Sequence, residues 1–155
     1  MIIRPTTPED TPEWSRMRTN LWPESDDQHL AEINAYFTHT SIDIQQCFVI
    51  ETNGQLAGFI ELNIRNFVEG SRMPQVPYIE AWYIEPDHRG QGYGTQLIKR
   101  AEQWALEQGF NELGSDTDTH NHASIAAHKH LGFEETYRIV CFLKQLKPTG
   151  AGSSR

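Results

Sequence analysis

The sequence predicts one α/β domain with a mixed, mostly antiparallel sheet flanked by helices. Three observations support this prediction: the length of 155 residues, the alternation of extended and helical patterns, and a glycine-rich turn between a strand and a helix. The expected order of elements is β-α-α-β-β-β-α-β-α-β. A chain of this length can bury a substantial core in a single domain, which we expect to cover residues 1–147.

The first half of the chain predicts a strand, two helices and a hairpin. Pro5 ends the first strand, and apolar residues at helical spacing follow Thr7-Pro8-Glu9-Asp10 as far as Pro23. Asn53-Gly54 is a strong two-residue turn signal between two extended runs. The first strand covers residues 1–4, and the elements after the first helix cover residues 27–37, 47–51 and 56–65.

In the second half, the glycine-rich turn lies between a strand over residues 78–84 and a helix that begins near Thr95. Residues 112–115 predict a further strand, and Gly132 closes a helix over residues 121–131. Residues 135–146 predict the last strand. We expect the tail of residues 148–155 to be disordered.

Composition narrows the classes of partner. The formal net charge of −8 argues against nucleic acid and anionic membranes and suits a cationic ligand. No apolar run is long enough to span a membrane and no signal pattern opens the chain, so we expect a cytoplasmic protein. Cys47 and Cys141 have apolar neighbours and predict buried thiols in a reducing compartment. The histidines lack metal-ligand spacing, so no metal is expected.

The turn Arg89-Gly90-Gln91-Gly92-Tyr93-Gly94 predicts an anion-binding loop. Its glycines let the backbone come close to a ligand, and N–H groups at the start of a helix attract phosphate. The turn lacks the Gly-Lys-Ser/Thr ending of a P-loop and the glycine spacing of a dinucleotide fingerprint. A surface turn that needs three glycines is the alternative interpretation.

With Pro86 upstream, this loop resembles the acetyl-coenzyme A loop of the GNAT acetyltransferase superfamily. Asn121-x-x-Ser124-x-x-x-His128-x-x-x-Gly132-Phe133 resembles the second signature of that superfamily. The resemblance covers residues 1–147 and implies a GNAT fold, with a splayed strand pair at the acetyl-coenzyme A site, in a homodimer. Further segments are similar to the bacterial aminoglycoside 6'-N-acetyltransferases: Leu21-Trp22-Pro23, Glu80-Ala81-Trp82-Tyr83, Ser115-Asp116 and Glu134-Glu135-Thr136.

The resemblance implies a set of coenzyme contacts. Backbone groups of Trp82, Tyr83 and Ile84 would bind the pantetheine arm as an added strand does, while core packing is the alternative role for the Trp82 and Ile84 side chains. Asn121 would reach the coenzyme through its side chain or serve as a plain helix cap. The pyrophosphate would bind to the N–H groups of Arg89, Gly90, Gln91, Gly92, Tyr93 and Gly94.

An aminoglycoside carries several ammonium groups, so its pocket needs carboxylates and an aromatic wall. The resemblance assigns Trp22, Glu80 and Asp116 to that pocket; a core position, a solvated position and a loop cap are their respective alternatives. Strand alternation predicts that Glu80 shares a face with Tyr78 and Trp82. Three further pocket positions depart from residues found in relatives, which bears on the preferred aminoglycoside: Phe67 for tyrosine, Ser25 for histidine and Tyr137 for glutamate.

The implied reaction is direct attack of a substrate amine on the thioester within a ternary complex. Glu80 is the candidate proton acceptor, with Asp116 as the alternative, and an N–H near Tyr83 could bond the thioester oxygen. His128 occupies the position where many GNAT enzymes have a tyrosine that protonates the thiolate. An acetyltransferase acting on a polyamine, another small amine or a peptide N-terminus, and a non-catalytic acyl-coenzyme A sensor, remain as alternatives.

Overall fold

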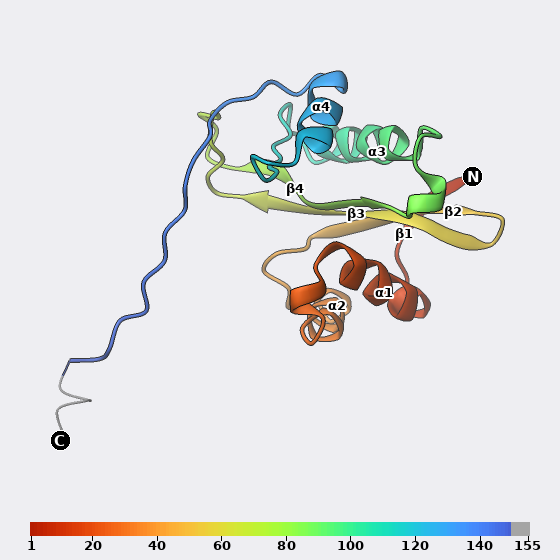
Figure 1. Cartoon of the computed structure of the whole chain (residues 1–155), viewed down its shortest axis with the longest axis horizontal. Coiled ribbons are helices and arrows are strands. Elements are labelled where there is room, and N and C mark those ends of the chain that lie inside the picture. Colours follow the sequence, from red (N-terminus) through yellow and green to blue (C-terminus); the bar gives the residue numbers. More distant parts are fainter. Residues whose placement is uncertain (150–155) are drawn as a thin grey trace.

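The computed structural model describes residues 1–149 and has three layers. Figure 1 shows a central sheet with α1 and α2 on one face and α3 and α4 on the other. The strands are β1 (Ile2–Pro5), β2 (Gln46–Thr52), β3 (Gln55–Arg65) and β4 (Val76–Ile84). The helices are α1 (Thr11–Leu21), α2 (His29–Phe37), α3 (Tyr93–Glu107) and α4 (His122–His130), with short 3-10 turns η1 (Pro8–Asp10), η2 (Pro23–Ser25) and η3 (Pro86–His88).

The strands pair antiparallel in the order β1-β2-β3-β4. The predicted hairpin between β2 and β3 is confirmed, and both turn residues have positive φ angles, 51° at Asn53 and 75° at Gly54. Such turns match the twist of the paired strands. The hairpin therefore forms for the local reason that the sequence indicates.

A bulge in β4 changes which side chains face the same way. Glu61 pairs with Ala81 and Leu62 with Ile79, so Glu80 is the extra residue of the pair. Ile79 and Trp82 both pack with α3, whereas Ala81 packs with α1. The prediction that Trp82 shares a face with Glu80 is therefore wrong, because the bulge shifts the alternation by one residue.

The two faces of the sheet have separate cores. The α3 face buries a hydrophobic cluster that includes Leu62, Leu97 and Ile98. The α1/α2 face is centred on Trp14 and Phe59, and Glu61 and Arg18 are buried beside them, at 1% and 4% exposure. No helix within residues 1–149 is long and apolar enough to cross a membrane.

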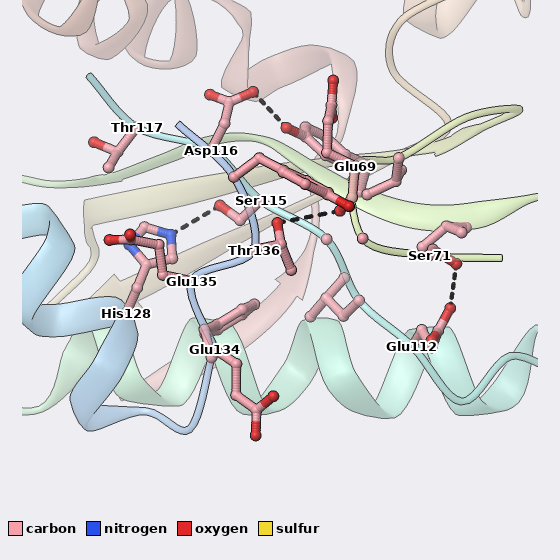
Figure 2. A pocket seen from close by; sticks show the side chains of 18 of the residues that line it. Glu69, Ser71, Glu112, Ser115, Asp116, Thr117, His128, Glu134, Glu135 and Thr136 are labelled. Atoms are coloured by element: carbon pink, nitrogen blue, oxygen red, sulfur yellow. Dashed lines mark hydrogen bonds between the residues drawn. The ribbon is translucent and has the colours of Figure 1, made fainter. Parts of the chain in front are cut away.

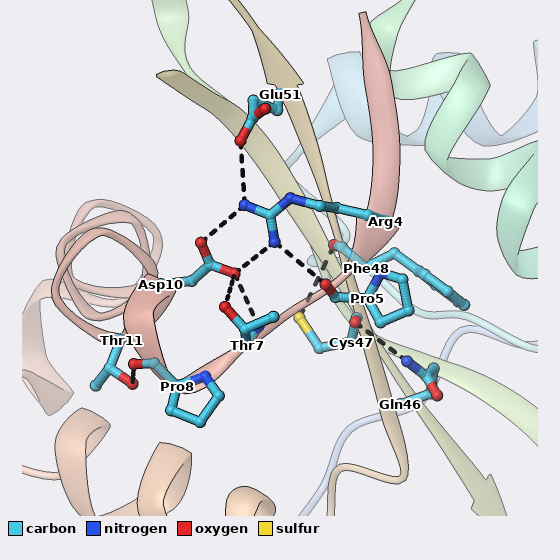
Figure 3. Close-up of polar contacts among 10 residues, drawn as sticks. All are labelled: Arg4, Pro5, Thr7, Pro8, Asp10, Thr11, Gln46, Cys47, Phe48 and Glu51. Carbon is cyan, nitrogen blue, oxygen red and sulfur yellow. Dashed lines mark hydrogen bonds and ion pairs between the residues drawn. The ribbon is translucent and has the colours of Figure 1, made fainter. Parts of the chain in front are cut away.

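Arg4 connects the first strand to the elements beside it (Figure 3). Its guanidinium donates to both carboxylate oxygens of Asp10, at 2.7 and 2.9 Å, and to Glu51 at 3.1 Å. The paired guanidinium holds the pKa of Asp10 below its ordinary value. Because Asp10 also accepts from the Thr7 N–H at 2.8 Å, this contact fixes η1 and the start of α1 against the sheet.

Two predicted strands are not formed. Residues 112–115 contribute a single parallel bridge, between Gly114 and Tyr78, and residues 135–146 contribute no strand. Residues 134–149, here termed the C-terminal arm, leave the body past the β4 edge (Figure 1). A strand needs a neighbour that pairs with its backbone, and within residues 1–149 the arm makes no backbone–backbone hydrogen bond; the Thr136 hydroxyl donates to Glu69 O at 3.2 Å. Cys141 lies on the arm and is exposed, contrary to the prediction of two buried thiols, and residues 150–155 of the predicted tail lie outside the described residues.

Candidate active site

The glycine loop has the geometry of an anion cradle. Gly90 and Gly92 have φ angles of 78° and 85°, and Gly92 caps the N-terminus of α3. Within residues 1–149, the N–H groups of the five residues from Gly90 to Gly94 have no acceptor. Arg89 differs, because its N–H bonds the Pro86 carbonyl at 3.3 Å. The loop therefore offers consecutive free donors beside the positive end of a helix dipole.

Next to the loop, the outer edge of β4 is open. Ile79 N–H donates to Gly114 O and Gly114 N–H to Pro77 O, both at 2.9 Å. Beyond this point no backbone hydrogen bond among the described residues joins the outer edge of residues 81–84 to another segment. Trp82 Nε1 donates to Gly94 O at 3.2 Å and so ties the open edge to the loop. A Cβ at position 94 would lie 3.1 Å from the Trp82 ring, so glycine permits this close approach.

Glu80 and Asp116 lie in one connected group of polar side chains. Arg65 donates to Glu80 through Nε at 2.9 Å and Nη2 at 2.7 Å, and Asn63 donates to it at 3.0 Å. The Arg65 guanidinium carbon lies 3.7 Å from the centre of the Tyr78 ring. The Tyr78 hydroxyl in turn donates to Asp116. Burial and the Asp116 carboxylate raise the pKa of Tyr78, so this hydroxyl stays protonated and remains a donor.

Asp116 also lines a cavity of about 860 Å³ beside the β4 edge. Figure 2 shows Asp116, Ser115 and His128 at this cavity, with Glu134 to Thr136 of the C-terminal arm on another wall. Tyr137 lines it as well and is exposed. Of β4, Val76 and Tyr78 line the cavity together with Gly114, so it lies beside the end of the strand that is bridged to Gly114.

His128 connects α4 to Ser115. Its Nδ1 lies 2.8 Å from the Ser124 carbonyl oxygen, which can only accept, so Nδ1 carries the proton. Its Nε2 lies 2.8 Å from Ser115 Oγ and accepts the hydroxyl proton in the neutral ring. The ring also meets Trp82 edge-on, with centroids 5.5 Å apart. A proton exchanged between His128 and a ligand in this arrangement would pass through Ser115.

Trp22 ends α1 and packs on a buried ionic group. The Arg18 guanidinium carbon lies 5.2 Å from its ring centre, and His29 Nε2 donates to its carbonyl at 3.2 Å. Arg18 Nε lies 3.4 Å from Glu61 Oε2, which also accepts from Trp14 Nε1 at 2.9 Å. Burial raises the pKa of Glu61 to about 7, although the Arg18 charge acts in the opposite direction.

The remaining predicted residues are less closely connected. Ser25 lies in η2 and Phe67 is exposed on the loop between β3 and β4; neither makes a side-chain hydrogen bond to another candidate. The Asn121 side chain accepts from the Ser124 N–H at 3.1 Å, which is the helix-cap role. Asn121 is exposed, and its amide nitrogen makes no hydrogen bond within the described residues.

Sequence reasoning missed Arg65, Asn63 and Tyr78. A signal for the first two was present, because Glu61, Asn63 and Arg65 alternate along an otherwise apolar strand and so share one face. The register with β4, in which Asn63 pairs with Tyr78 and so lies near Glu80, was not readable from either strand alone.

Comparison of the sequence with known proteins identifies the family. The sequence model of the Acetyltransferase (GNAT) family matches residues 10–133. The chain belongs to this family. It is 36% identical to the aminoglycoside N(6')-acetyltransferase type 1 of Klebsiella aerogenes, over 94% of this chain and 97% of the relative. It is 34% identical to the protein of the same description from Stenotrophomonas maltophilia, over 95% of each.

Solved structures of GNAT relatives show the same fold. The aminoglycoside 6'-N-acetyltransferase AAC(6')-Ig from Acinetobacter haemolyticus superposes with a TM-score of 0.86 at 31% identity, over 95% of this chain and 100% of the other. AAC(6')-Iy in complex with the bisubstrate analogue CoA-S-monomethyl-acetylneamine superposes with the same score and identity, over 94% and 98%. The GNAT fold expected from the sequence is thereby confirmed.

Proposed function

We propose that this protein transfers the acetyl group of acetyl-coenzyme A to the 6'-amine of aminoglycosides and so confers resistance to these antibiotics. The observation that carries the proposal is the placement of a free-donor glycine loop and an open strand edge beside a group of carboxylates. The first two suit a pyrophosphate and a pantetheine amide chain, and the third suits a polycationic acceptor. The relatives named above support this reading.

The acetyl-coenzyme A would lie along the open edge of β4. Backbone groups of Trp82, Tyr83 and Ile84 would pair with the pantetheine arm, and the five free N–H groups from Gly90 to Gly94 would hold the pyrophosphate. The Arg89 guanidinium donates to the Ile84 carbonyl at 2.8 Å, so its positive charge is held beside the same loop. The free amide nitrogen of Asn121 is available to the coenzyme.

The acceptor would bind on the side of Glu80 and Asp116. Its neutral amine attacks the thioester carbonyl carbon, the carbon–sulfur bond breaks, and the amine loses one proton while coenzyme A leaves as the thiol. Asp116 is the more available proton acceptor, because the Tyr78 hydroxyl occupies one of its oxygens while Glu80 already accepts three hydrogen bonds. Ser115, hydrogen-bonded to His128, would return a proton to the thiolate.

Thiol release from acetyl-coenzyme A tests this function. We expect steady release with tobramycin and kanamycin, and none with an aminoglycoside that has a hydroxyl at the 6' position. Release with spermidine or a short peptide alone would reject the aminoglycoside and retain an acetyltransferase. Coenzyme binding without release for any amine would favour the sensor alternative.

The C-terminal arm supports a homodimer. Phe142 and Leu143 are each 90% exposed, and Ile139, Val140 and Leu146 are exposed with them. Such exposed apolar side chains on an extended segment are typical of a strand whose pairing partner lies on another chain. The segment around Gly114 makes one bridge to β4 and offers a free edge beside the 860 Å³ cavity. We propose that each arm adds as a strand to this region of a second copy, so that Tyr137 of one copy lies at the shared site.

Light scattering tests the exchange of arms. We expect a dimer for the full chain and a monomer for a chain that ends at Ile139, because residues 140–147 carry most of the exposed apolar side chains. Phe142→Asp in the full chain should also shift the equilibrium towards monomer, since a buried unpaired charge is costly. A dimer that persists in both variants would contradict the proposal.

A cytoplasmic location accords with a supply of acetyl-coenzyme A and with two cysteines that are not paired.

A further inference from the structure

Glu80 is almost fully occupied before any substrate binds. A carboxylate has about four acceptor positions on its two oxygens. Oε2 accepts from Arg65 Nε at 2.9 Å and from Asn63 at 3.0 Å, and Oε1 accepts from Arg65 Nη2 at 2.7 Å. One position, on Oε1, remains for a ligand. The two-point contact with Arg65 also fixes the plane of the carboxylate, so the direction of that free position is defined.

Arg65 is itself held in place by the site. It lies at the end of β3, and its guanidinium rests on the Tyr78 ring at 3.7 Å. Tyr78 is buried and donates to Asp116. The Arg65 guanidinium thus contacts Glu80 directly. It also packs on Tyr78, and the Tyr78 hydroxyl orients Asp116.

The register of the two strands sets this contact. Tyr78 pairs with Asn63, so Glu80, two residues further along β4, keeps the face that carries Asn63 and Arg65. As the extra residue of the bulge, Glu80 has no partner of its own on β3, and the bulge turns Trp82 to the opposite face. The pair is therefore a product of the register of both strands.

We propose that Arg65 is a positioning and specificity-determining residue for acetyl transfer, which fixes Glu80 with one acceptor directed at the substrate and limits the attraction of the site for cations. This inference rests on the proposed function. By neutralising Glu80, Arg65 prevents a substrate ammonium from forming the same two-point pair in an unproductive position. An ammonium held in that way would stay protonated and could not attack the thioester.

The charge of Arg65 and its two-point hydrogen bonding to Glu80 can be removed separately, with different consequences. In Arg65→Gln the charge is lost, so a polycationic acceptor should bind more tightly, with KM for tobramycin lowered about threefold or more. The same variant should lower kcat about tenfold or more, because Glu80 is no longer fixed. Arg65→Lys keeps the charge without the two-point hydrogen bonding, so KM should stay within about twofold of the wild type while kcat falls severalfold.

The experiment is steady-state kinetics with tobramycin at saturating acetyl-coenzyme A for the wild type, R65Q, R65K and R72Q. Arg72 is exposed on the loop between β3 and β4, so R72Q removes the same charge away from Glu80 and should leave both constants within about twofold. The KM difference between R65Q and the wild type should shrink at high salt, as a charge effect does. Thermal melting of each variant serves as the control for folding.

The outcomes separate the inference from the function on which it rests. Wild-type turnover with R65Q constants unchanged, or with KM raised and kcat unchanged, overturns the role of Arg65 alone. Equal KM values for R65K and R65Q overturn the charge effect. No turnover of tobramycin by the wild type overturns the proposed function and this inference together.

Discussion

The α3 face of the sheet buries a hydrophobic cluster around Leu62 and Leu97, whereas the α1/α2 face also buries Glu61, Arg18 and Asn63. The glycine loop adjoins the first face and binds through backbone N–H groups. Glu80 lies on the second face and binds through its charge. The comparison teaches that the proposed donor site depends on packing and backbone shape, while the proposed acceptor site depends on electrostatics. Substitutions on the two faces should therefore have separable effects.

The largest expected effect is on the α3 face. Leu97→Ala removes a fully buried side chain and should lower the free energy of unfolding by about 2–5 kcal/mol. The loss should not depend on pH, because the cluster around Leu97 is hydrophobic. Urea denaturation at pH 5 and pH 8 measures it. Leu30→Ala, at an exposed leucine of α2, is the control and should change stability by less than about 1 kcal/mol.

On the other face, Glu80→Gln should affect the acceptor and spare the donor. The variant keeps the shape of the side chain but removes the charge that pairs with Arg65, so kcat/KM for tobramycin should fall about a hundredfold. KM for acetyl-coenzyme A should stay within about twofold of the wild type. Glu107→Gln, at an exposed carboxylate of α3, is the matched control. A comparable change in both substrates' constants for E80Q would contradict the separation of the faces.

The buried Glu61 makes the stability of the α1/α2 face depend on pH. The pKa of Glu61 is about 7 in the folded protein, against 4.5 for a solvent-exposed glutamate such as that of the unfolded chain. Between these two pH values the folded state binds the proton more tightly, so stability falls as pH rises from 4.5 through 7. The wild type should lose about 2–3 kcal/mol relative to Glu61→Gln between pH 5 and pH 8. Parallel pH profiles of stability for the two proteins would show that Glu61 does not titrate in this range.

The smallest expected effect isolates the glycine loop. Gly92→Val places a side chain at a φ angle of 85° where the pyrophosphate would approach, so KM for acetyl-coenzyme A should rise about tenfold or more. Gly109→Val is a close control, because Gly109 has a φ angle of 90°, nothing within 4 Å of its Cβ position and no place in the loop. Equal losses in the two variants would show that backbone strain, not ligand approach, is responsible.

Features governed by neighbouring residues were predicted well. The hairpin at Asn53-Gly54, β4 and the glycine loop with its helix all follow from local turn chemistry and periodicity. Helix α2 begins two residues later than expected, at His29 instead of residue 27. The two strands that failed, over residues 112–115 and 135–146, have suitable side chains but depend on a neighbour that the sequence pattern does not supply.

The candidate site was predicted in its residues more than in its connections. Resemblance supplied Glu80, Asp116 and His128, and the structure places each of them in a polar contact. Which partner each one takes was not predictable, because Arg65 reaches Glu80 only through the register of two strands. Asn121 is found in the cap role that its position at a helix start already allowed.

The extra residue at Glu80 has a consequence for how this protein can diverge over generations. Residues 76–79 and 81–84 pair with β3 on opposite sides of the bulge, so the two ends of β4 are in different phases. Deleting Glu80 would join the two halves in a regular ladder that keeps the pairing of both with β3, so only the carboxylate on the acceptor side would be lost. Descendants could therefore acquire a new range of acceptors while inheriting the use of the same acetyl donor.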